Sequence, residues 1–293
     1  MTARLSLPAA AAVLALLTGC AAGPSAPPAT PVAAASEPAA TAAPSGLPPE
    51  GDPLASPAIG PSAGTLPSEL PSPPAPSPQL LPSGRLAPVV TTVRTTQPVV
   101  FLGIDDGFVR SPWLLALERR RHLPFSMFLE GNAWSQDVAY WRAMQAAGAT
   151  VEDHTVTHPV LTRLSSRRVA REICSAADGE ANAFGIRPVL FRPPYGSTDR
   201  RVQAAAAECG MRAVVLWDVA VNDGQVQFGP GRSHLRAGDI VLMHFRQTMQ
   251  ADMTAFLNQA AADHLALGRL EDYLLPAPAD GSPTPSTPGS SSP

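Results

Sequence analysis

Short apolar runs alternate with longer stretches of helical periodicity between residues 97 and 275. The runs are rich in Val, Ile, Leu and Phe and predict strands, at residues 98–104, 125–129, 150–152, 188–191, 213–217 and 240–244. The other stretches predict helices, at residues 111–121, 134–147, 164–184, 199–209 and 249–267. Strands that alternate with helices build right-handed βαβ units and a parallel sheet, either open and doubly wound or curled into an incomplete barrel.

Residues able to do chemistry stand at the ends of these predicted strands. Asp105 and Asp106 follow the first strand, His154 the third and Arg192 the fourth, and His244 ends the last. The carboxyl ends of parallel strands gather at one edge of an α/β fold, where ligands bind. We therefore expect these residues to meet although they are distant in the sequence.

Asp106, His154 and His158 form a set of three ligands for one metal ion. Three protein ligands with a fourth position left for water are typical of hydrolytic zinc sites. The two histidines belong to a loop rather than a helix, because three β-branched residues separate them and a proline follows. The structural alternative is a pair of hydrogen-bonded surface histidines beside an Asp-Asp-Gly turn.

The remaining polar residues suggest roles around that set. Two adjacent carboxylates repel one another unless cations face them, so Arg192 is a candidate partner for Asp105. The prolines after Arg192 fix the loop and leave the backbone amide of Tyr195 available for a developing oxyanion. Taken alone, this segment is a Pro-rich turn with an exposed arginine, and His244 is a packed or solvated histidine.

Composition confines the folded part to a single domain at residues 96–276. Residues 20–95 and 277–293 are dominated by Ala, Pro, Ser and Gly and have too few large apolar side chains to offset the entropy of ordering. We predict a disordered linker and a disordered tail there. The net charge of -3 gives no sign of nucleic-acid binding, and no obligate protein partner is evident.

Residues 1–19 have the features of an export signal, with Arg4 before an apolar run too short for a membrane span. The run ends in Leu-Thr-Gly-Cys20, which resembles a bacterial lipobox. It predicts cleavage before Cys20, lipidation of its thiol and anchoring to the outer face of the cell membrane; an ordinary signal peptide is the alternative. Cys174 and Cys209 then remain as a disulfide pair or as two buried thiols.

Four segments resemble the polysaccharide deacetylases of carbohydrate esterase family four. In family order they are Ile104-Asp-Asp-Gly107, His154-Thr-Val-Thr-His158-Pro159, Arg192-Pro-Pro-Tyr195 and Leu242-Met-His244, within residues 97–275. The resemblance implies a deformed (β/α) barrel of the α/β class. It also implies a divalent metal ion, usually Zn²⁺ with Co²⁺ or another divalent ion as alternatives, held by residues matching Asp106, His154 and His158.

The resemblance assigns the other roles residue by residue. Asp105 matches the general base that acts on a metal-bound water, and Arg192 matches the residue that pairs with this base. The amide of Tyr195 matches the oxyanion donor. His244 matches the general acid, which amide hydrolysis requires because an amine leaves very poorly as an anion.

The chain departs from the family pattern at several positions. Gly103-Ile104 stands where Thr-Phe is common, and Glu152-Asp153 stands before the first histidine in place of Gly-Asn. In the segment from Trp217 to Gly224, Asp223 fits the Asp of an Asp-Trp pair that tunes the acid and walls the sugar groove, but Gly224 replaces the Trp. We therefore count Trp217 and Asp223 only as supporting residues.

The sequence predicts an exported, lipid-anchored, metal-dependent hydrolase that removes acetyl groups from N-acetylated or O-acetylated glycans. Peptidoglycan N-acetylglucosamine is the first substrate expected, on the ground of localisation alone. The alternative is a non-catalytic, glycan-binding wall lipoprotein with the same fold.

Overall fold

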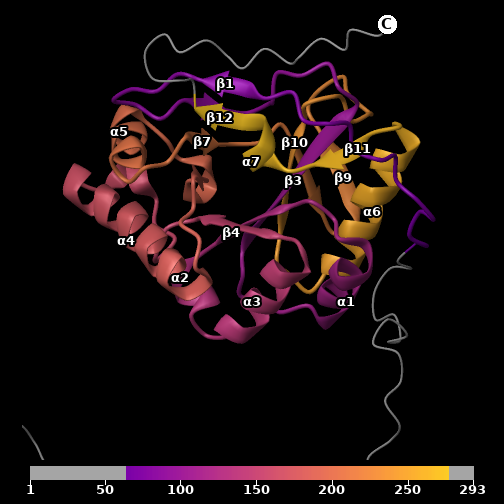
Figure 1. Ribbon diagram of the computed structural model, residues 1–293, viewed down its shortest axis with the longest axis horizontal. Coiled ribbons are helices and arrows are strands. Elements are labelled where there is room, and N and C mark those ends of the chain that lie inside the picture. The colour runs from indigo at the N-terminus through magenta and orange to yellow at the C-terminus, as the bar shows by residue number, and fades with distance from the viewer. Residues whose placement is uncertain (1–63, 277–293) are drawn as a thin grey trace, which may run out of the picture. The chain divides into compact units, whose positions relative to one another are not determined.

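A computed structural model describes residues 64–276. Its main element is a ten-stranded sheet in the order β2-β7-β6-β5-β4-β3-β10-β8-β9, with β11 paired to β3 (Figure 1). All neighbours in it are parallel except the hairpin formed by β8 and β9. Thr92, just after β2, bridges Asp239, just before β10, so the sheet curls back on itself. The predicted incomplete barrel is confirmed, and the open sheet is excluded.

The six predicted strands are all present. They are β3 (Val99–Asp106), β4 (Ser126–Leu129), β5 (Thr150–Asp153), β6 (Leu190–Phe191), β7 (Ala213–Val215) and β10 (Ile240–His244). Strand β3 lies at the centre of the sheet and is buried along almost its whole length, as its continuous apolar run predicts.

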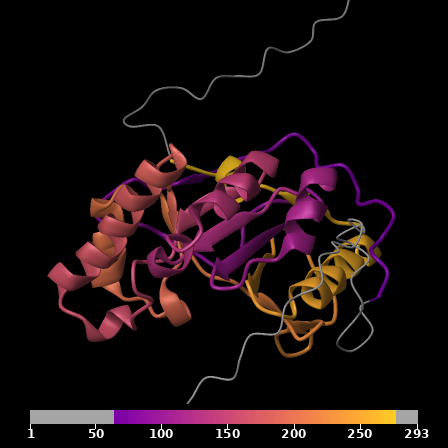
Figure 2. The same ribbon diagram turned by 90° about the horizontal axis from the view of Figure 1, so that it is seen from below.

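Helices cover the outside of the curled sheet. In Figures 1 and 2, α4 and α5 lie at one side of it and α6 at the other. The long helices are α1 (Pro112–Arg121), α3 (Val138–Ala147), α4 (Ser166–Phe184), α5 (Arg200–Glu208) and α6 (Met249–Ala262). The short ones are α2 (Gly131–Trp134), α7 (Leu270–Tyr273), η1 (Leu161–Arg163) and η2 (Pro194–Gly196).

Local sequence explains where the helices begin. The side chains of Ser111, Asp137 and Asp199 accept hydrogen bonds from backbone amides in the first turns of α1, α3 and α5. Such caps satisfy amides that have no partner inside the helix. Helix α4 ends at Gly185, whose left-handed conformation suits glycine.

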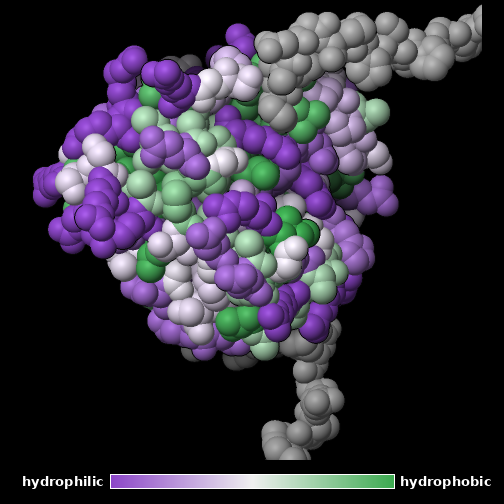
Figure 3. All heavy atoms as spheres, turned by 60° about the vertical axis from the view of Figure 1, so that its left-hand side comes forward, coloured by the Kyte–Doolittle hydropathy of each residue, from purple (hydrophilic) through white to green (hydrophobic). Residues whose placement is uncertain are grey.

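Three groups of apolar side chains form the core. One fills the space under α1, α3 and α6, another lies inside the curled sheet around Phe101 and Phe128, and the third lies under α4 and α5. Each buried side chain of the size of Leu or Phe stabilises the fold by about 1.5–3 kcal/mol relative to exposure. On the side shown in Figure 3, hydrophobic residues are interspersed among hydrophilic ones.

The folded part begins earlier than residue 96, so the predicted linker boundary was wrong. Strand β1 (Gln79–Leu81) pairs with β12 (Leu274–Pro276), and β2 (Val89–Val90) pairs with β7. The side chain of Gln97 also holds this segment, through Ser77 and Ala75. The many prolines concealed these short strands, whose partners lie far away in the sequence.

Two further differences lie in the C-terminal half. The helix expected at 249–267 ends at Ala262 and is followed by β11 (Ala266–Gly268). The segment after Trp217 forms a hairpin of β8 (Val219–Asn222) and β9 (Gln225–Phe228). Asp223 and Gly224 form its two-residue turn with φ of 51° and 73°, a conformation for which Asp-Gly is well suited.

Cys174 of α4 and Cys209 after α5 form a disulfide, with their Cα atoms 4.9 Å apart. The predicted signal peptide, Cys20, most of the linker and the tail at 277–293 lie outside the described residues. No helix within residues 64–276 is both long and apolar enough to cross a bilayer.

Candidate active site

The two adjacent carboxylates at the end of β3 point to different partners. Asp105 is 3% exposed and lies against Arg192. Asp106 has a φ of 78°, which is unusual for a residue other than glycine, and lies against His154 and His158. Strained backbone of this kind concentrates at functional sites. The arrangement gives each carboxylate a separate environment.

Asp106, His154 and His158 form a cluster whose potential ligand atoms all lie within 4.8 Å of one another. The Oδ1 atom of Asp106 is 3.6 Å from Nε2 of His154 and 3.4 Å from Nε2 of His158. The structure therefore brings together the three predicted ligands, from the ends of β3 and β5. One carboxylate and two imidazoles suit Zn²⁺ and other divalent ions of similar preference.

The orientation of His154 fits metal binding. Its Nδ1 atom is 2.6 Å from the carbonyl oxygen of Arg192. Because a carbonyl oxygen can only accept, Nδ1 donates its hydrogen to it, and Nε2 faces Asp106, where the neutral imidazole can ligate a metal ion. Histidines that ligate metals characteristically donate their other N–H in this way.

The loop between the two histidines is held in an uncommon conformation. Thr155 and His158 have φ values of 70° and 53°. The amide and hydroxyl of Thr157 bind the Glu172 carboxylate, and the amide of His158 donates to the Thr155 hydroxyl. These contacts fix the His158 ring beside Asp106.

Electrostatics within the cluster follow from burial and neighbouring charge. Burial raises the pKa of Asp106, but the hydrogen bond and charge of His154 outweigh it and hold this pKa below its usual value. Burial and the nearby His154 lower the pKa of His158. The cluster therefore favours an ionised carboxylate beside a neutral His158, which are the protonation states that ligate metals.

Asp105 forms an ion pair with Arg192, as predicted. Nη1 of Arg192 is 2.6 Å from Oδ1 of Asp105. The guanidinium is fully buried, with its Nε 3.4 Å from the Val215 carbonyl and its Cζ 4.1 Å from the centre of the Phe128 ring. Asp105 thus has a fixed orientation beside the metal cluster, with Oδ2 3.8 Å from Nε2 of His154.

Tyr195 lies in the turn η2 with a φ of 59°. Its side chain is 66% exposed, and its ring centre is 4.7 Å from that of His158. Trp217 packs beside the next residue, because a Cβ atom on Gly196 would lie 3.2 Å from the Trp217 ring. Tyr195 therefore stands beside His158 in a loop that the two prolines stiffen, and Trp217, which follows β7, packs against that loop.

His244 ends β10, where its Cα pairs with that of Asp105. Its Nδ1 atom is buried without a hydrogen-bond partner among the described residues, and burial lowers its pKa. Asp223 was expected as a supporting partner, but it is exposed in the hairpin turn, and no hydrogen bond joins it to His244 within residues 64–276. The turn conformation of Asp-Gly explains this difference.

Sequence reasoning missed Glu130, which follows β4 and is 3% exposed. Burial and the nearby charge of Asp106 raise the pKa of Glu130 to about 7. It could have been found, because it is an acidic residue directly after a predicted strand at the same edge of the sheet. Phe108, also unpredicted, follows the Asp-Asp-Gly turn and is 50% exposed.

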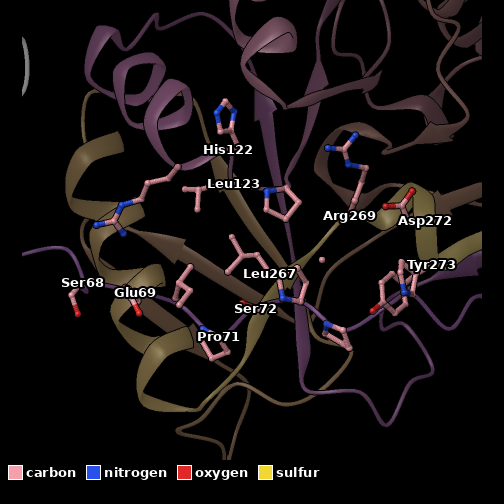
Figure 4. Close-up of a pocket in the computed structure, with 17 residues that line it drawn as sticks. Ser68, Glu69, Pro71, Ser72, His122, Leu123, Leu267, Arg269, Asp272 and Tyr273 are labelled. Carbon is pink, nitrogen blue, oxygen red and sulfur yellow. The ribbon is translucent and has the colours of Figure 1, made fainter.

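A large cavity lies away from this cluster. It has a volume of about 820 Å³ and lies between the segment from Ser68 to Pro76 and the residues around β11 and α7 (Figure 4). His122 and Leu123, which precede β4, also line it, so it opens near the amino ends of the strands. None of the predicted site residues contributes to it.

Residues 92–214 match the sequence profile of the polysaccharide deacetylase family. An uncharacterized protein of Streptomyces coelicolor is 36% identical over 195 residues, covering 65% of this chain and 78% of the relative. A chitooligosaccharide deacetylase of a Bradyrhizobium species is 32% identical over 155 residues, covering 50% of this chain and 69% of the relative.

Other relatives are much longer than the matched region. The chain spans 23 to 33% of three of them. One is a peptidoglycan-N-acetylglucosamine deacetylase of Listeria monocytogenes, which is 28% identical over 49% of this chain and is covered to 30%.

The fold is shared with a family 4 carbohydrate esterase of Streptomyces lividans that was solved in complex with acetate. The TM-score is 0.53 at 28% identity, over 62% of this chain and 100% of that one. This likeness confirms the deformed barrel that the sequence motifs implied. The chain belongs to the polysaccharide deacetylase family.

Proposed function

We propose that this protein is a metal-dependent hydrolase that removes acetyl groups from glycans. The observation that carries the proposal is the cluster of Asp106, His154 and His158 beside an Asp105 that Arg192 holds in place. Metal-dependent hydrolysis needs a place for the metal ion and a general base next to it. Membership of the polysaccharide deacetylase family supports this chemistry.

In the proposed reaction each residue has one role. A divalent metal ion, which Asp106, His154 and His158 would hold, would polarise the acetyl carbonyl and ease ionisation of the attacking water. Asp105 takes the proton of that water, and Arg192 keeps the carboxylate oriented. The amide of Tyr195 donates to the developing oxyanion, and His244 gives a proton to the leaving nitrogen or oxygen.

The proposed substrate is peptidoglycan N-acetylglucosamine, with other N-acetylated or O-acetylated glycans as alternatives. The Listeria and Bradyrhizobium relatives, named for peptidoglycan and chitooligosaccharide deacetylation, support a substrate of N-acetylated sugars. We further propose export and anchoring to the outer face of the membrane through Cys20. The Leu-Thr-Gly-Cys segment and the pairing of Cys174 with Cys209 support this location, since disulfides persist in oxidising compartments.

The test measures acetate release from N-acetylglucosamine oligomers and from peptidoglycan, with and without a chelator. We expect release that stops on chelation and returns when Zn²⁺ is added. Glycan binding without acetate release, unchanged by added Zn²⁺, would favour the non-catalytic wall protein. The presence of all six polar residues of the site argues against that alternative. These residues are Asp105, Asp106, His154, His158, Arg192 and His244.

A further inference from the structure

The guanidinium of Arg192 occupies the space that a side chain on residue 103 would need. A Cβ atom added to Gly103 would lie 2.5 Å from both Nη1 and Nη2 of Arg192 and 2.8 Å from its Cζ. Cβ atoms do not approach heavy atoms this closely, so one of the two groups would have to move. The backbone of Gly103 is ordinary strand without a positive φ, so only this contact calls for glycine.

The surroundings leave Arg192 little room to move aside. Strand periodicity places residues 101, 103 and 105 on the same face of β3, toward the inside of the curled sheet. Arg192 is 0% exposed. Its Cζ is 4.1 Å from the centre of the Phe128 ring and 5.9 Å from the centre of the Trp217 ring. The guanidinium is therefore confined between Gly103 and these rings, and Asp105 is the acid that it meets there.

We propose that Gly103 is a positioning residue for the reaction. Its missing side chain leaves room for the guanidinium beside β3, where Nη1 binds Asp105 and sets the direction of the carboxylate that takes the proton. The inference rests on the proposed function in that Asp105 is the base. The three heavy atoms nearest a Cβ on Gly103 all belong to Arg192, and none belongs to Asp106, His154 or His158.

The variant Gly103→Ala tests this role in the full-length chain. The added methyl group displaces Arg192 and so weakens its hold on Asp105, which we expect to lower kcat by about 10- to 100-fold. KM and bound Zn²⁺ stay near those of the unmodified protein, because the cluster of Asp106, His154 and His158 is untouched. A kcat within about twofold of the unmodified protein overturns the proposal.

Gly268→Ala is the matched control. Gly268 lies in β11, paired with β3, and a Cβ there would lie 2.5 Å from Cγ2 of Val99 and 2.8 Å from Cε1 of Phe101. The clash is equally close but involves apolar side chains only. This variant should lose stability while its folded fraction keeps the kcat of the unmodified protein. An equal loss of kcat in both variants would mean that crowding of the sheet, not Arg192, is responsible, and would overturn the proposal.

A double-mutant cycle with Arg192→Lys provides a second readout. Lysine carries a smaller cationic group than the guanidinium, so it relieves the clash with the added methyl group although it pairs less well with Asp105. In the Gly103→Ala background, Arg192→Lys should therefore cost no further activity or should restore part of it. If the two losses simply multiply, residue 103 acts independently of Arg192 and the proposal fails.

A crystal structure of Gly103→Ala separates this inference from the proposed function. The expected result is an Asp105–Arg192 pair that is broken or lengthened, whatever the protein hydrolyses. If the unmodified protein released no acetate while this displacement was seen, the proposed function would fail and the positional role would stand. An unchanged ion pair at residues 105 and 192 would refute the positional role, even in an active enzyme.

Discussion

Two buried aspartates of this protein face partners of opposite charge type: one faces an arginine and the other faces a second acid. Inside the curled sheet, Asp105 faces Arg192 at hydrogen-bond distance. Between β5 and α4, Asp153 faces the Glu180 carboxyl, and Oδ2 of Asp153 and both side-chain oxygens of Glu180 have no hydrogen-bond partner among the described residues. We call the first the site pair and the second the α4 pair.

Burial is nearly the same in the two pairs, but its consequence is not. Burial raises the pKa of Asp153 to about 8, and burial with the nearby Asp153 raises that of Glu180 well above its usual range. Arg187, whose charge opposes the rise in the pKa of Glu180, is bound to the exposed Asp178. Beside the site pair, the hydrogen bond and charge of His154 keep the pKa of Asp106 low. The negative charge is therefore favoured at Asp106, which the proposed chemistry uses as a metal ligand, and disfavoured at Asp153 and Glu180.

The largest expected effect separates the two acids at the end of β3. Asp106→Ala should lower metal affinity by at least about 100-fold, because it removes a ligand. Asp105→Asn should keep the metal and lower kcat by about 10² to 10⁴-fold, because it removes the base. Metal analysis and acetate release check both variants. Full metal loading of both would show that the ligand assignment is wrong.

A second prediction concerns the loss of the arginine from the site pair. Arg192→Met leaves Asp105 buried without its cation, which should lower the free energy of unfolding at pH 7 by about 3–5 kcal/mol. Urea unfolding measures the loss. Adding Asp105→Asn to this variant removes the buried charge and should restore much of the stability. If the double variant is no more stable than Arg192→Met, the unpaired charge of Asp105 is not the cause of the loss.

The smallest effect concerns the α4 pair. Glu180→Gln removes a carboxyl that must stay protonated in the fold, so at pH 7 it should raise the free energy of unfolding by about 1–3 kcal/mol. The unfolded state ionises near pH 4.5, whereas the folded state keeps the proton to higher pH. The stability of the unmodified protein therefore falls as pH rises from about 4.5 toward the raised folded pKa.

Urea unfolding between pH 4 and 8 checks the Glu180 prediction. The advantage of Glu180→Gln should be absent near pH 4 and should grow with pH. Glu208→Gln, an exposed acid of α5, is the control and should change stability little at any pH. An advantage of Glu180→Gln that is independent of pH would mean that packing, not ionisation, explains it.

The sequence predicted best those features whose signal is local and continuous. The buried run of β3 and the placement of Asp106 and His154 after strands could both be read from neighbouring residues. Because parallel strands end at one edge, that placement was enough to bring the three metal-binding candidates together.

The features that were missed depend on partners elsewhere in the chain. Strand β2 has two residues and exists through its pairing with β7, so proline content outweighed its weak signal. The hairpin of β8 and β9 placed Asp223 in an exposed turn, away from the supporting role that its alignment with a motif suggested. Pattern alone does not reveal such positions, because each is set by register and turn geometry.

The sequence by itself determined the α/β class, the strand ends that carry the site and the set of residues able to hold a metal, since periodicity and position within a strand are local properties. Only the tertiary structure showed that the buried acids Asp153 and Glu180 lie close to one another. Gly103 stood out in the sequence as a departure without a reason, and the packing of Arg192 against it supplies one. Cys174 and Cys209 likewise became a pair only when α4 and α5 were placed side by side. The physical reason is the same in each case. The charge, the available volume and the bonding of a buried residue depend on the side chain nearest to it, and that side chain comes from a distant part of the sequence.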